Sequence, residues 1–320
     1  MSDPWVAGTF AAATLAASWI ATGRVLAWLI HRQIVDTPNH RSSHTQPTPR
    51  GGGIGLLAGL LPALLVFAFF TSAPLPWLVL IAGSAGLALL SWRDDRIHVS
   101  ARWRLLAQIV AVAAGLAALD GGLVFQGLLP PALDLIAAGL AWVWFVNLTN
   151  FMDGIDGITG VEAASIGIGL ALVGAPATPA LIVAAGAIGF LRWNWHPARL
   201  FMGDVGSVPL GYLLGALLLM LAKMGHWAPA LILPGYYLAD ATWTLLRRLI
   251  QRKRVWEAHR EHFYQQATQR GWSHARVSIS VGVLNLCLIF LAFLALSTPW
   301  PALALAAVLV GATLLRFARA

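Results

Sequence analysis

Charged residues and cysteine are both scarce in this sequence. Asp, Glu, Lys and Arg make up only 11% of the 320 residues, whereas 58% are hydrophobic; soluble domains carry about 25% charged residues. This deficit excludes an ordinary soluble domain, because most of the chain could not face water. The single cysteine, Cys287, excludes an internal disulfide, and its apolar surroundings predict a small buried side chain.

Long apolar runs occupy most of the chain instead. A membrane-spanning helix needs about 20 predominantly apolar residues. The sequence predicts an all-α, polytopic transmembrane helical bundle of 10 to 11 membrane-spanning helices, with residues 1–320 as a single domain. Eleven candidate spans meet the criterion: 5–31, 51–72, 75–92, 104–120, 131–149, 157–174, 177–192, 206–222, 227–248, 277–297 and 299–318.

The Lys and Arg residues predict the orientation, because cytoplasmic loops are enriched in them. If the N-terminus lies outside and all eleven spans are threaded, 19 of the 21 Lys and Arg residues fall inside. Lys223 alone falls outside, and Arg24 lies within the first span. We therefore expect a cytoplasmic face built from five loops, at about 32–50, 93–104, 147–157, 192–206 and 249–276.

A pair of adjacent carboxylates, Asp94 and Asp95, follows the third predicted span. Two such groups at a membrane surface repel each other unless a cation relieves the repulsion. Arg93 and Arg96 flank the pair, so a solvated charge cluster without a ligand is the alternative interpretation.

A regular polar pattern lies at the end of the fifth predicted span. Asn147, Asn150, Asp153 and Asp156 recur at every third position, with apolar residues between them. Such a set sweeps half of an α-helix or aligns on a tighter 3₁₀ turn. An aspartate at the end of a span is a functional hypothesis by default. The regular spacing favours a ligand pocket over a helix end that frays into a polar loop.

A glycine-rich turn, Gly203-Asp204-Val-Gly206-Ser207, opens the eighth predicted span. Backbone N–H groups at such a helix N-terminus are free to bind an anion. A carboxylate beside them commonly holds Mg²⁺, which in turn binds phosphate oxygens. The alternative is a plain helix N-cap at Asp204 or Ser207.

Two histidines flank an arginine and a glutamate in the last inner loop, as His259-Arg260-Glu261-His262. Imidazole and guanidinium groups suit phosphate contacts. A zinc site is disfavoured, because no cysteine and no further nearby histidine completes it. A solvated loop is the alternative.

The first inner loop adds cations to the same face. It contains Asp36, His44 and Arg50 and then enters the second span through three glycines. No Gly-Lys-Ser/Thr follows, so these glycines are not a P-loop, and a simple turn is the alternative. Together, the five segments indicate a site that moves a phosphate-bearing group from a soluble donor onto a lipid.

The motifs and their order resemble the polyprenyl-phosphate N-acetylhexosamine-1-phosphate transferases, glycosyltransferase family 4. This family includes phospho-N-acetylmuramoyl-pentapeptide transferase. The resemblance runs from about Asp36 to Tyr264. The pentapeptide transferases have consecutive histidines in the last loop, so this chain looks more like the branch that initiates O-antigen synthesis. The family's basic residue after the aspartate pair would be Arg102 or Arg104, between which the sequence does not distinguish.

The resemblance implies a reaction at the bacterial inner (plasma) membrane, with the active site on the cytoplasmic face. A UDP-N-acetylhexosamine, with GlcNAc or a modified HexNAc, and undecaprenyl phosphate would give undecaprenyl-diphospho-N-acetylhexosamine and UMP. The cofactor would be Mg²⁺, with Mn²⁺ as a substitute. The product would begin O-antigen, lipopolysaccharide or another cell-envelope polysaccharide. A homodimer is plausible by analogy, and no nucleic-acid partner is expected.

The resemblance also implies roles for individual residues. Asp204 is the first choice of Mg²⁺ ligand, and Asp94 or Asp95 would orient or deprotonate the lipid phosphate and also bind the metal. A phosphate monoester has a second pKa near 6, which favours orientation. Asp153 lines the nucleotide pocket or acts as the nucleophile of a two-step mechanism. The substrate-binding residues would be Asn147, Asn150, Asp156, His44, Arg50, Gly203, Ser207, His259, Arg260 and His262.

Two other functions fit part of the pattern. A secondary transporter would carry charges near the bilayer midplane and show inverted repeats, whereas the acidic residues here lie at the inner ends of spans. A CDP-alcohol-type phosphotransferase would concentrate its aspartates in one helix pair, whereas this chain spreads them over three loops.

Overall fold

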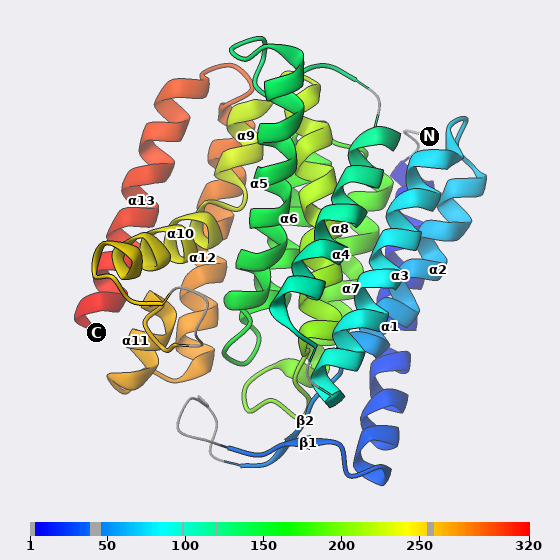
Figure 1. Cartoon of the computed structure of the whole chain (residues 1–320), viewed down its shortest axis with the longest axis vertical. Coiled ribbons are helices and arrows are strands. Elements are labelled where there is room, and N and C mark those ends of the chain that lie inside the picture. The colour runs from blue at the N-terminus through cyan, green and yellow to red at the C-terminus, as the bar shows by residue number, and fades with distance from the viewer. Residues whose placement is uncertain (1–3, 39–45, 98, 120, 255–258) are drawn as a thin grey trace.

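Helices make up nearly all of the regular structure. The computed structural model describes residues 4–38, 46–97, 99–119, 121–254 and 259–320. Within these ranges there are 13 helices and one antiparallel ribbon of two short strands. Figure 1 shows most of the helices side by side along the long axis of the molecule. The all-α prediction is confirmed.

Ten helices run along the bundle, and the ribbon lies at one end of it (Figure 1). The ribbon pairs β1 (Val35–Asp36) with β2 (Thr48–Pro49). The ten helices are α1 (Pro4–His31), α2 (Gly53–Phe69), α3 (Pro74–Ile97), α4 (Ala101–Ala118), α5 (Pro131–Phe151), α6 (Ile158–Leu172), α7 (Ala177–Asn194), α8 (Asp204–Lys223), α12 (His274–Leu294) and α13 (Pro299–Arg319).

Several of these helices have the length and apolarity of membrane spans. Among the described residues, seven helices meet both criteria: α1, α3, α4, α5, α8, α12 and α13. Helices α2 and α6 are apolar but only 17 and 15 residues long. The chain is therefore a polytopic helical membrane protein. The count of 10 to 11 spans and the outside N-terminus stay predictions.

The ninth predicted span, 227–248, is wrong as one continuous helix. Helix α9 (Trp227–Ile232) stops at a turn, and α10 (Gly235–Ile250) leaves it at a large angle (Figure 1). Pro234 lies in this turn, and proline cannot donate the backbone hydrogen bond that would continue the helix. Both pieces are rich in apolar residues, so a hydropathy average hides the break.

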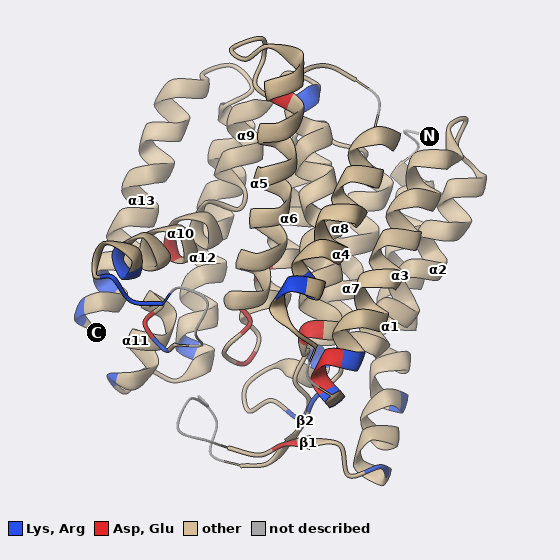
Figure 2. Ribbon diagram, in the orientation of Figure 1, with Lys and Arg blue, Asp and Glu red and all other residues tan. Residues whose placement is uncertain are grey.

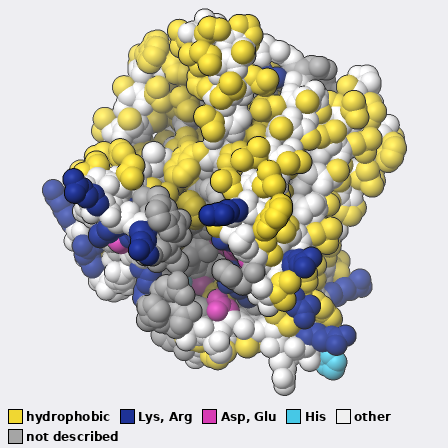
Figure 3. All heavy atoms as spheres, viewed as in Figure 1, with side chains coloured by type: hydrophobic (Ala, Val, Ile, Leu, Met, Phe, Trp, Pro, Cys, Tyr) yellow, Lys and Arg dark blue, Asp and Glu magenta, His cyan; other side chains and the backbone are white. Residues whose placement is uncertain are grey.

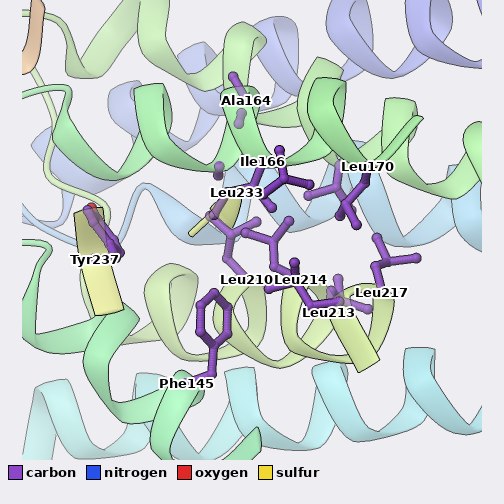
Figure 4. Close-up of a cluster of buried hydrophobic side chains, with 14 of the residues drawn as sticks. Phe145, Ala164, Ile166, Leu170, Leu210, Leu213, Leu214, Leu217, Leu233 and Tyr237 are labelled. Carbon is purple, nitrogen blue, oxygen red and sulfur yellow. The ribbon is translucent and has the colours of Figure 1, made fainter. Parts of the chain in front are cut away.

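Helix α8 forms the centre of the bundle. In the most apolar 18-residue stretch of this helix, 94% of the residues are buried. The helix packs against α2, α3, α5, α6, α7 and α9. Figure 4 shows Leu210, Leu213 and Leu214 of α8 among side chains from neighbouring helices, including Phe145 and Ile166. Asp204 is the first residue of this helix, so the best-packed element of the bundle positions a predicted catalytic residue.

Close backbone contact joins the N-terminal ends of α2 and α8. A Cβ atom added to Gly53 would lie 2.2 Å from the Cα atom of Gly206. The Gly53 N–H also donates to the carbonyl oxygen of Met202 at 2.9 Å. Small residues at such crossings allow two helices to approach closely.

Cys287 departs from the prediction that it is buried. Its side chain is exposed on α12. Helices that face lipid carry apolar residues on both their buried and their exposed sides, so an apolar run does not tell the two sides apart.

We expect Gly53→Ala to destabilise the protein. The added methyl group must push α2 away from α8, and overpacking of this kind typically costs about 1–3 kcal/mol. Thermal unfolding of the purified protein in detergent measures the effect. The matched control is Gly311→Ala on α13, where no heavy atom lies within 4 Å of an added Cβ. This control should be neutral or slightly stabilising, and equal losses in the two variants would contradict the close approach.

Candidate active site

Charged side chains gather at one end of the bundle, which we call the polar end. Figure 2 shows most of the Lys, Arg, Asp and Glu residues in two groups, one around β1, β2 and the neighbouring helix ends and the other around α10, α11 and the C-terminus. Figure 3 shows acidic side chains inside a recess on this part of the surface. Asp134 and Lys223 belong to the opposite end, at the start of α5 and the end of α8.

A short backbone pairing carries Arg50 to the start of α8. The Phe201 N–H donates to Pro49 O at 2.8 Å, and the Gly52 N–H donates to Phe201 O at 2.8 Å. Arg50 and Phe201 form a parallel bridge. This pairing brings Arg50 against Asp204, although 154 residues separate them in the sequence.

Two arginines hold three carboxylates together at this point. Arg50 Nη2 lies 2.8 Å from Asp204 Oδ1 and 3.0 Å from Asp95 Oδ1. Arg104 Nη1 lies 2.8 Å from Asp94 Oδ2 and 3.7 Å from Asp204 Oδ2. We call these five residues the acid cluster. Its three carboxylate side chains are mostly buried, with exposed fractions of 8, 9 and 19% for Asp94, Asp95 and Asp204.

The contacts of the acid cluster distinguish Arg104 from Arg102. Arg104, in the first turn of α4, contacts two of the aspartates, whereas Arg102 is exposed. Asp94 and Arg104 face each other across the connection between α3 and α4, where the Val99 N–H donates to Asp94 Oδ1 at 2.7 Å. The basic residue associated with the aspartate pair is therefore Arg104.

Gly203 allows Asp95 to approach the start of α8. Its φ of +72° is in the left-handed region, which glycine adopts readily. A Cβ atom at this position would lie 3.2 Å from Asp95 Oδ2 and 3.3 Å from Arg50 Cγ. The predicted substrate-binding residues Gly203 and Arg50 thus belong to the acid cluster or touch it.

The acid cluster has the donor set for a hard divalent cation. Three carboxylates face two arginines, so the cluster carries a net negative charge when all five groups are ionised. Asp95 Oδ2 is buried and accepts no hydrogen bond from the described residues, and a buried acceptor without a partner is costly. Carboxylate oxygens suit Mg²⁺ and Mn²⁺, so the chemistry of Asp94, Asp95 and Asp204 suits such an ion. Among the described residues, however, only Asp156, His196 and His274 bring three ligand atoms within 4.8 Å of one another.

A cavity of about 460 Å³ adjoins the acid cluster. Apolar residues, among them Leu87, Leu105 and Phe151, form one part of its wall. The other part is polar and comprises Ser91, Arg104, Gln108, Asn147, Asn150, Asp204, His259 and His262. The cavity therefore offers charged and hydrogen-bonding groups beside an apolar surface.

The two asparagines of α5 face this cavity, and neighbouring helices fix their orientation. Asn147 Nδ2 donates to Gln108 Oε1 at 2.7 Å. Asn150 Nδ2 donates to Ser207 Oγ at 3.0 Å. Ser207 thus contacts the cavity wall through Asn150. Sequence reasoning missed Gln108, which lies inside a span where a single amide attracted no notice.

Asp153 lies beyond the cavity lining but interacts electrostatically with the acid cluster. Burial raises the pKa of Asp153 to about 7, and the negative charge of Asp204 adds to this rise. A hydrogen bond from Thr159 and the positive charge of Arg50 act in the opposite direction. This carboxyl group therefore titrates near neutral pH.

Asp156 lies apart from the acid cluster, in a separate cluster with two histidines. Its Oδ2 atom lies 2.6 Å from His196 Nδ1 and 3.2 Å from His274 Nδ1, and it accepts the Ala198 N–H at 3.2 Å. Burial alone would raise the pKa of Asp156, but the hydrogen bonds from His274 and His196 outweigh it and lower the pKa. The three side chains could also hold a metal ion, since one ligand atom from each lies within 4.8 Å of the others.

The segment from His259 to His262, which we call the histidine loop, contributes both of its histidines to the cavity wall. His262 is only 2% exposed and His259 is half-buried, and their rings stack with centroids 4.9 Å apart. Burial, together with nearby His262 and Arg248, lowers the pKa of His259 to about 4, so its ring is neutral at pH 7. Arg260 is not among the cavity-lining residues. His44 lies outside the described residues.

Sequence reasoning also missed a carboxylate behind this loop. Asp240 of α10 is fully buried and lies 3.2 Å from His262 Nδ1. An acidic residue inside an apparent span is a signal in itself, and it could have directed attention to this position. His196 and His274, the partners of Asp156, carry no comparable signal, because each is an isolated histidine in a loop or at a helix start.

Comparison with known proteins places the chain among membrane transferases. Residues 77–222 match the model of glycosyl transferase family 4. A probable undecaprenyl-phosphate N-acetylglucosaminyl 1-phosphate transferase of Bacillus subtilis is 28% identical, over 77% of this chain and 73% of that protein. A decaprenyl-phosphate N-acetylglucosaminephosphotransferase of Mycolicibacterium smegmatis is 28% identical, over 82% and 76%. A phospho-N-acetylmuramoyl-pentapeptide-transferase of Synechococcus elongatus is 30% identical, over 77% and 75%.

We expect Asp153→Asn to stabilise the metal-free protein increasingly as the pH rises. Because the folded pKa is about 7 and the ordinary value is near 3.9, the folded chain holds this proton more tightly than the unfolded chain. Stability is fully present below the unfolded pKa and is lost as the pH rises through the folded pKa, by about 1.4 kcal/mol per pKa unit. Asparagine mimics the protonated acid, so its advantage should grow from pH 4.5 and level off above pH 7.

Thermal unfolding in detergent with EDTA, from pH 4.5 to 8.5, measures this effect. Asp156→Asn is the control with the opposite sign, because a lowered pKa means that the ionised carboxylate stabilises the fold. This variant should be less stable than the wild type throughout the range. A pH-independent difference for Asp153→Asn would show that its pKa is not raised.

Proposed function

The chain belongs to glycosyl transferase family 4, and from this membership and the acid cluster we propose that it transfers N-acetylhexosamine-1-phosphate from a UDP-N-acetylhexosamine to undecaprenyl phosphate. The products are undecaprenyl-diphospho-N-acetylhexosamine and UMP. The main support for this proposal is the acid cluster, which lies beside a cavity with both polar and apolar walls in a membrane protein. Such a site suits a charged donor and a lipid acceptor, and family membership sets aside the transporter and CDP-alcohol alternatives.

The bond changes define what the site must do. An oxygen of the lipid phosphate attacks the β-phosphorus of the UDP-sugar, a new P–O bond forms, and the bond between this phosphorus and the UMP oxygen breaks. One diphosphate replaces another, so the step is close to thermoneutral. Catalysis then consists mainly of bringing two anions together in line and neutralising their charge.

The residues of the acid cluster divide this work. Arg50 and Arg104 bridge the carboxylates in the free protein, and they are placed to contact phosphate oxygens as the substrates enter. Asp204, Asp94 and Asp95 would hold Mg²⁺ or Mn²⁺, which supplies positive charge to the diphosphate when bound. The acceptor phosphate is largely ionised at pH 7, so no carboxylate has to serve as a general base.

The cavity wall supplies the remaining contacts. Asn147 and Asn150 present amide groups from α5, and His259 and His262 present imidazoles from the histidine loop. We assign these groups to the nucleotide diphosphate and the sugar. Asp153 has a pKa raised to about 7, so its protonation near neutral pH changes the net charge near the nucleotide. Its covalent attack on the donor is the alternative mechanism.

The relatives guide the choice of donor and pathway. Two of them are named as transferases of N-acetylglucosamine phosphate and one as a phospho-N-acetylmuramoyl-pentapeptide-transferase. We therefore propose UDP-GlcNAc or a modified UDP-HexNAc as the donor. The reaction would take place on the cytoplasmic face of a bacterial inner membrane and begin an O-antigen or another cell-envelope polysaccharide.

Release of UMP by the purified protein in detergent tests the proposed function. Undecaprenyl phosphate is supplied with a panel of UDP-N-acetylhexosamines, with and without Mg²⁺. We expect release that requires the lipid, the metal and one preferred donor. Asp204→Asn should reduce the rate by roughly 100-fold or more, because it removes charge stabilisation at the reacting phosphates. Metal-dependent turnover of this variant at the wild-type rate would reject the metal assignment, and no release from any donor by folded protein would reject the reaction.

Arg104 and Arg102 form a matched pair for a second test. Arg104 contacts Asp94 and Asp204, whereas Arg102 is exposed two residues earlier in the same helical turn. Arg104→Gln should lower kcat by roughly 100-fold, as expected for the loss of one preorganised charge. Arg102→Gln should stay within about twofold of the wild type. Equal effects of the two substitutions would contradict the assignment of Arg104 to the site.

A further inference from the structure

Asp240 is a fully buried carboxylate that joins two helices. It lies on α10 with no exposed surface. Within its own helix it accepts the Tyr236 hydroxyl at 3.1 Å and the Thr244 hydroxyl at 3.3 Å. A charge with so little access to water requires such compensation.

The remaining contacts of Asp240 reach the start of α11 (Phe263–Gln269). The Phe263 N–H donates to Oδ1 at 3.0 Å, and the Tyr264 N–H donates to Oδ2 at 3.2 Å. The His262 ring lies on the same carboxylate, with Nδ1 at 3.2 Å from Oδ1. One side chain of α10 thus fixes both the backbone and the imidazole of the histidine loop.

This arrangement selects one nitrogen of His262 for the cavity. Nδ1 lies beside the Asp240 carboxylate, and the His262 side chain also accepts the backbone N–H of Gln265 in the capping box of α11. The carboxylate is charged and has no hydrogen to donate, whereas the amide is neutral, so we assign the ring proton to Nδ1. Nε2 is then the ring nitrogen left for a ligand, and the ring lines the same cavity as Asp204 and Arg104.

His259 has the opposite arrangement. Its Nδ1 lies 3.4 Å from the backbone N–H of Glu261, which donates to it. Nδ1 of His259 is therefore an acceptor, and its proton belongs on Nε2. We therefore assign different tautomers to the two stacked histidines, because Nδ1 of His262 has a carboxylate beside it, whereas the hydrogen bond at Nδ1 of His259 comes from a backbone N–H.

We propose that Asp240 is a positioning residue that acts through His262, holding it as the Nδ1–H tautomer so that Nε2 contacts the phosphate groups of the substrates. This assignment rests on the proposed function for the identity of the anion. The tautomer itself follows from the contacts of Asp240 and can be measured without turnover.

Nitrogen-15 NMR of histidine-labelled protein in detergent tests the tautomer. His262→Gln and His259→Gln assign the two sets of ring signals. In the wild type we expect a protonated Nδ1 for His262 and a protonated Nε2 for His259. In Asp240→Asn the His262 signals should move toward a tautomer mixture, while the His259 signals serve as the internal reference and stay unchanged. A protonated Nε2 on His262 in the neutral wild-type ring would overturn the proposal, whether or not any variant folds.

Kinetics of UMP release test whether Asp240 and His262 act as a unit. Asp240→Asn and His262→Gln should each reduce kcat by roughly 100-fold, the scale of one proton-transfer or anion-stabilising group. The double variant should be no slower than either single variant, because both substitutions remove the same contact. Additive losses, or full activity of Asp240→Asn, would overturn the positioning role.

Thr244→Val provides the structural control. It removes another hydrogen bond to Oδ1 of Asp240 but leaves His262 in place. Its turnover should stay within about twofold of the wild type, and the His262 tautomer should not change. A loss of turnover equal to that of Asp240→Asn would mean that packing around α10, and not His262, explains the effect. If the wild type uses no donor, the tautomer measurement still decides on Asp240 while the proposed function fails.

Discussion

Compensation of buried negative charge is the constraint on which the polar end of this protein depends. The carboxylates of Asp94, Asp95 and Asp204 are each less than one-fifth exposed, and isolated buried carboxylates are strongly destabilising. The two arginines that relieve them come from distant segments. Their convergence requires that the chain before α2 pairs with residue 201 and that α3 turns back directly into α4. The charge balance of the site therefore depends on these two backbone arrangements.

Buried carboxylates with several hydrogen-bond donors also occur at other connections between helices. Asp134 accepts the Val124 and Phe125 N–H groups at the opposite end of the bundle, Asp156 receives two imidazoles, and Asp240 secures the start of α11. In each case a carboxylate at or near a helix binds donors that belong to a loop or to the first turn of another helix. In a chain with only 13 acidic residues, such uses account for much of the acidic content. A carboxylate is well suited to this task, since its two oxygens accept several hydrogen bonds from different directions.

The sequence predicts the acidic members of the acid cluster, because each of these carboxylates lies at the end of an apolar run and is therefore conspicuous. The asparagines of α5 are found for the same reason. The choice between Arg102 and Arg104 depends on the rotation of α4 relative to α3, which no composition argument supplies. The break at Pro234 is hidden because the surrounding 22 residues average as apolar, whereas Asp240 is visible in the sequence as an acidic residue inside that apparent span. His196 and His274 are predictable only when the loops that contain them are known to meet at Asp156.

The break between α9 and α10 connects these observations. A continuous helix would carry Asp240 along the bundle axis, whereas the turn at Pro234 directs α10 across it (Figure 1). In this direction Asp240 contacts His262, which lines the same cavity as Asp204. The acid cluster is anchored to the densely packed α8, and the histidines are anchored to α10 through Asp240. The width of the cavity between them is therefore set by how two separate helices pack, so that a change at the turn would alter the distance between the two halves of the site without touching either half.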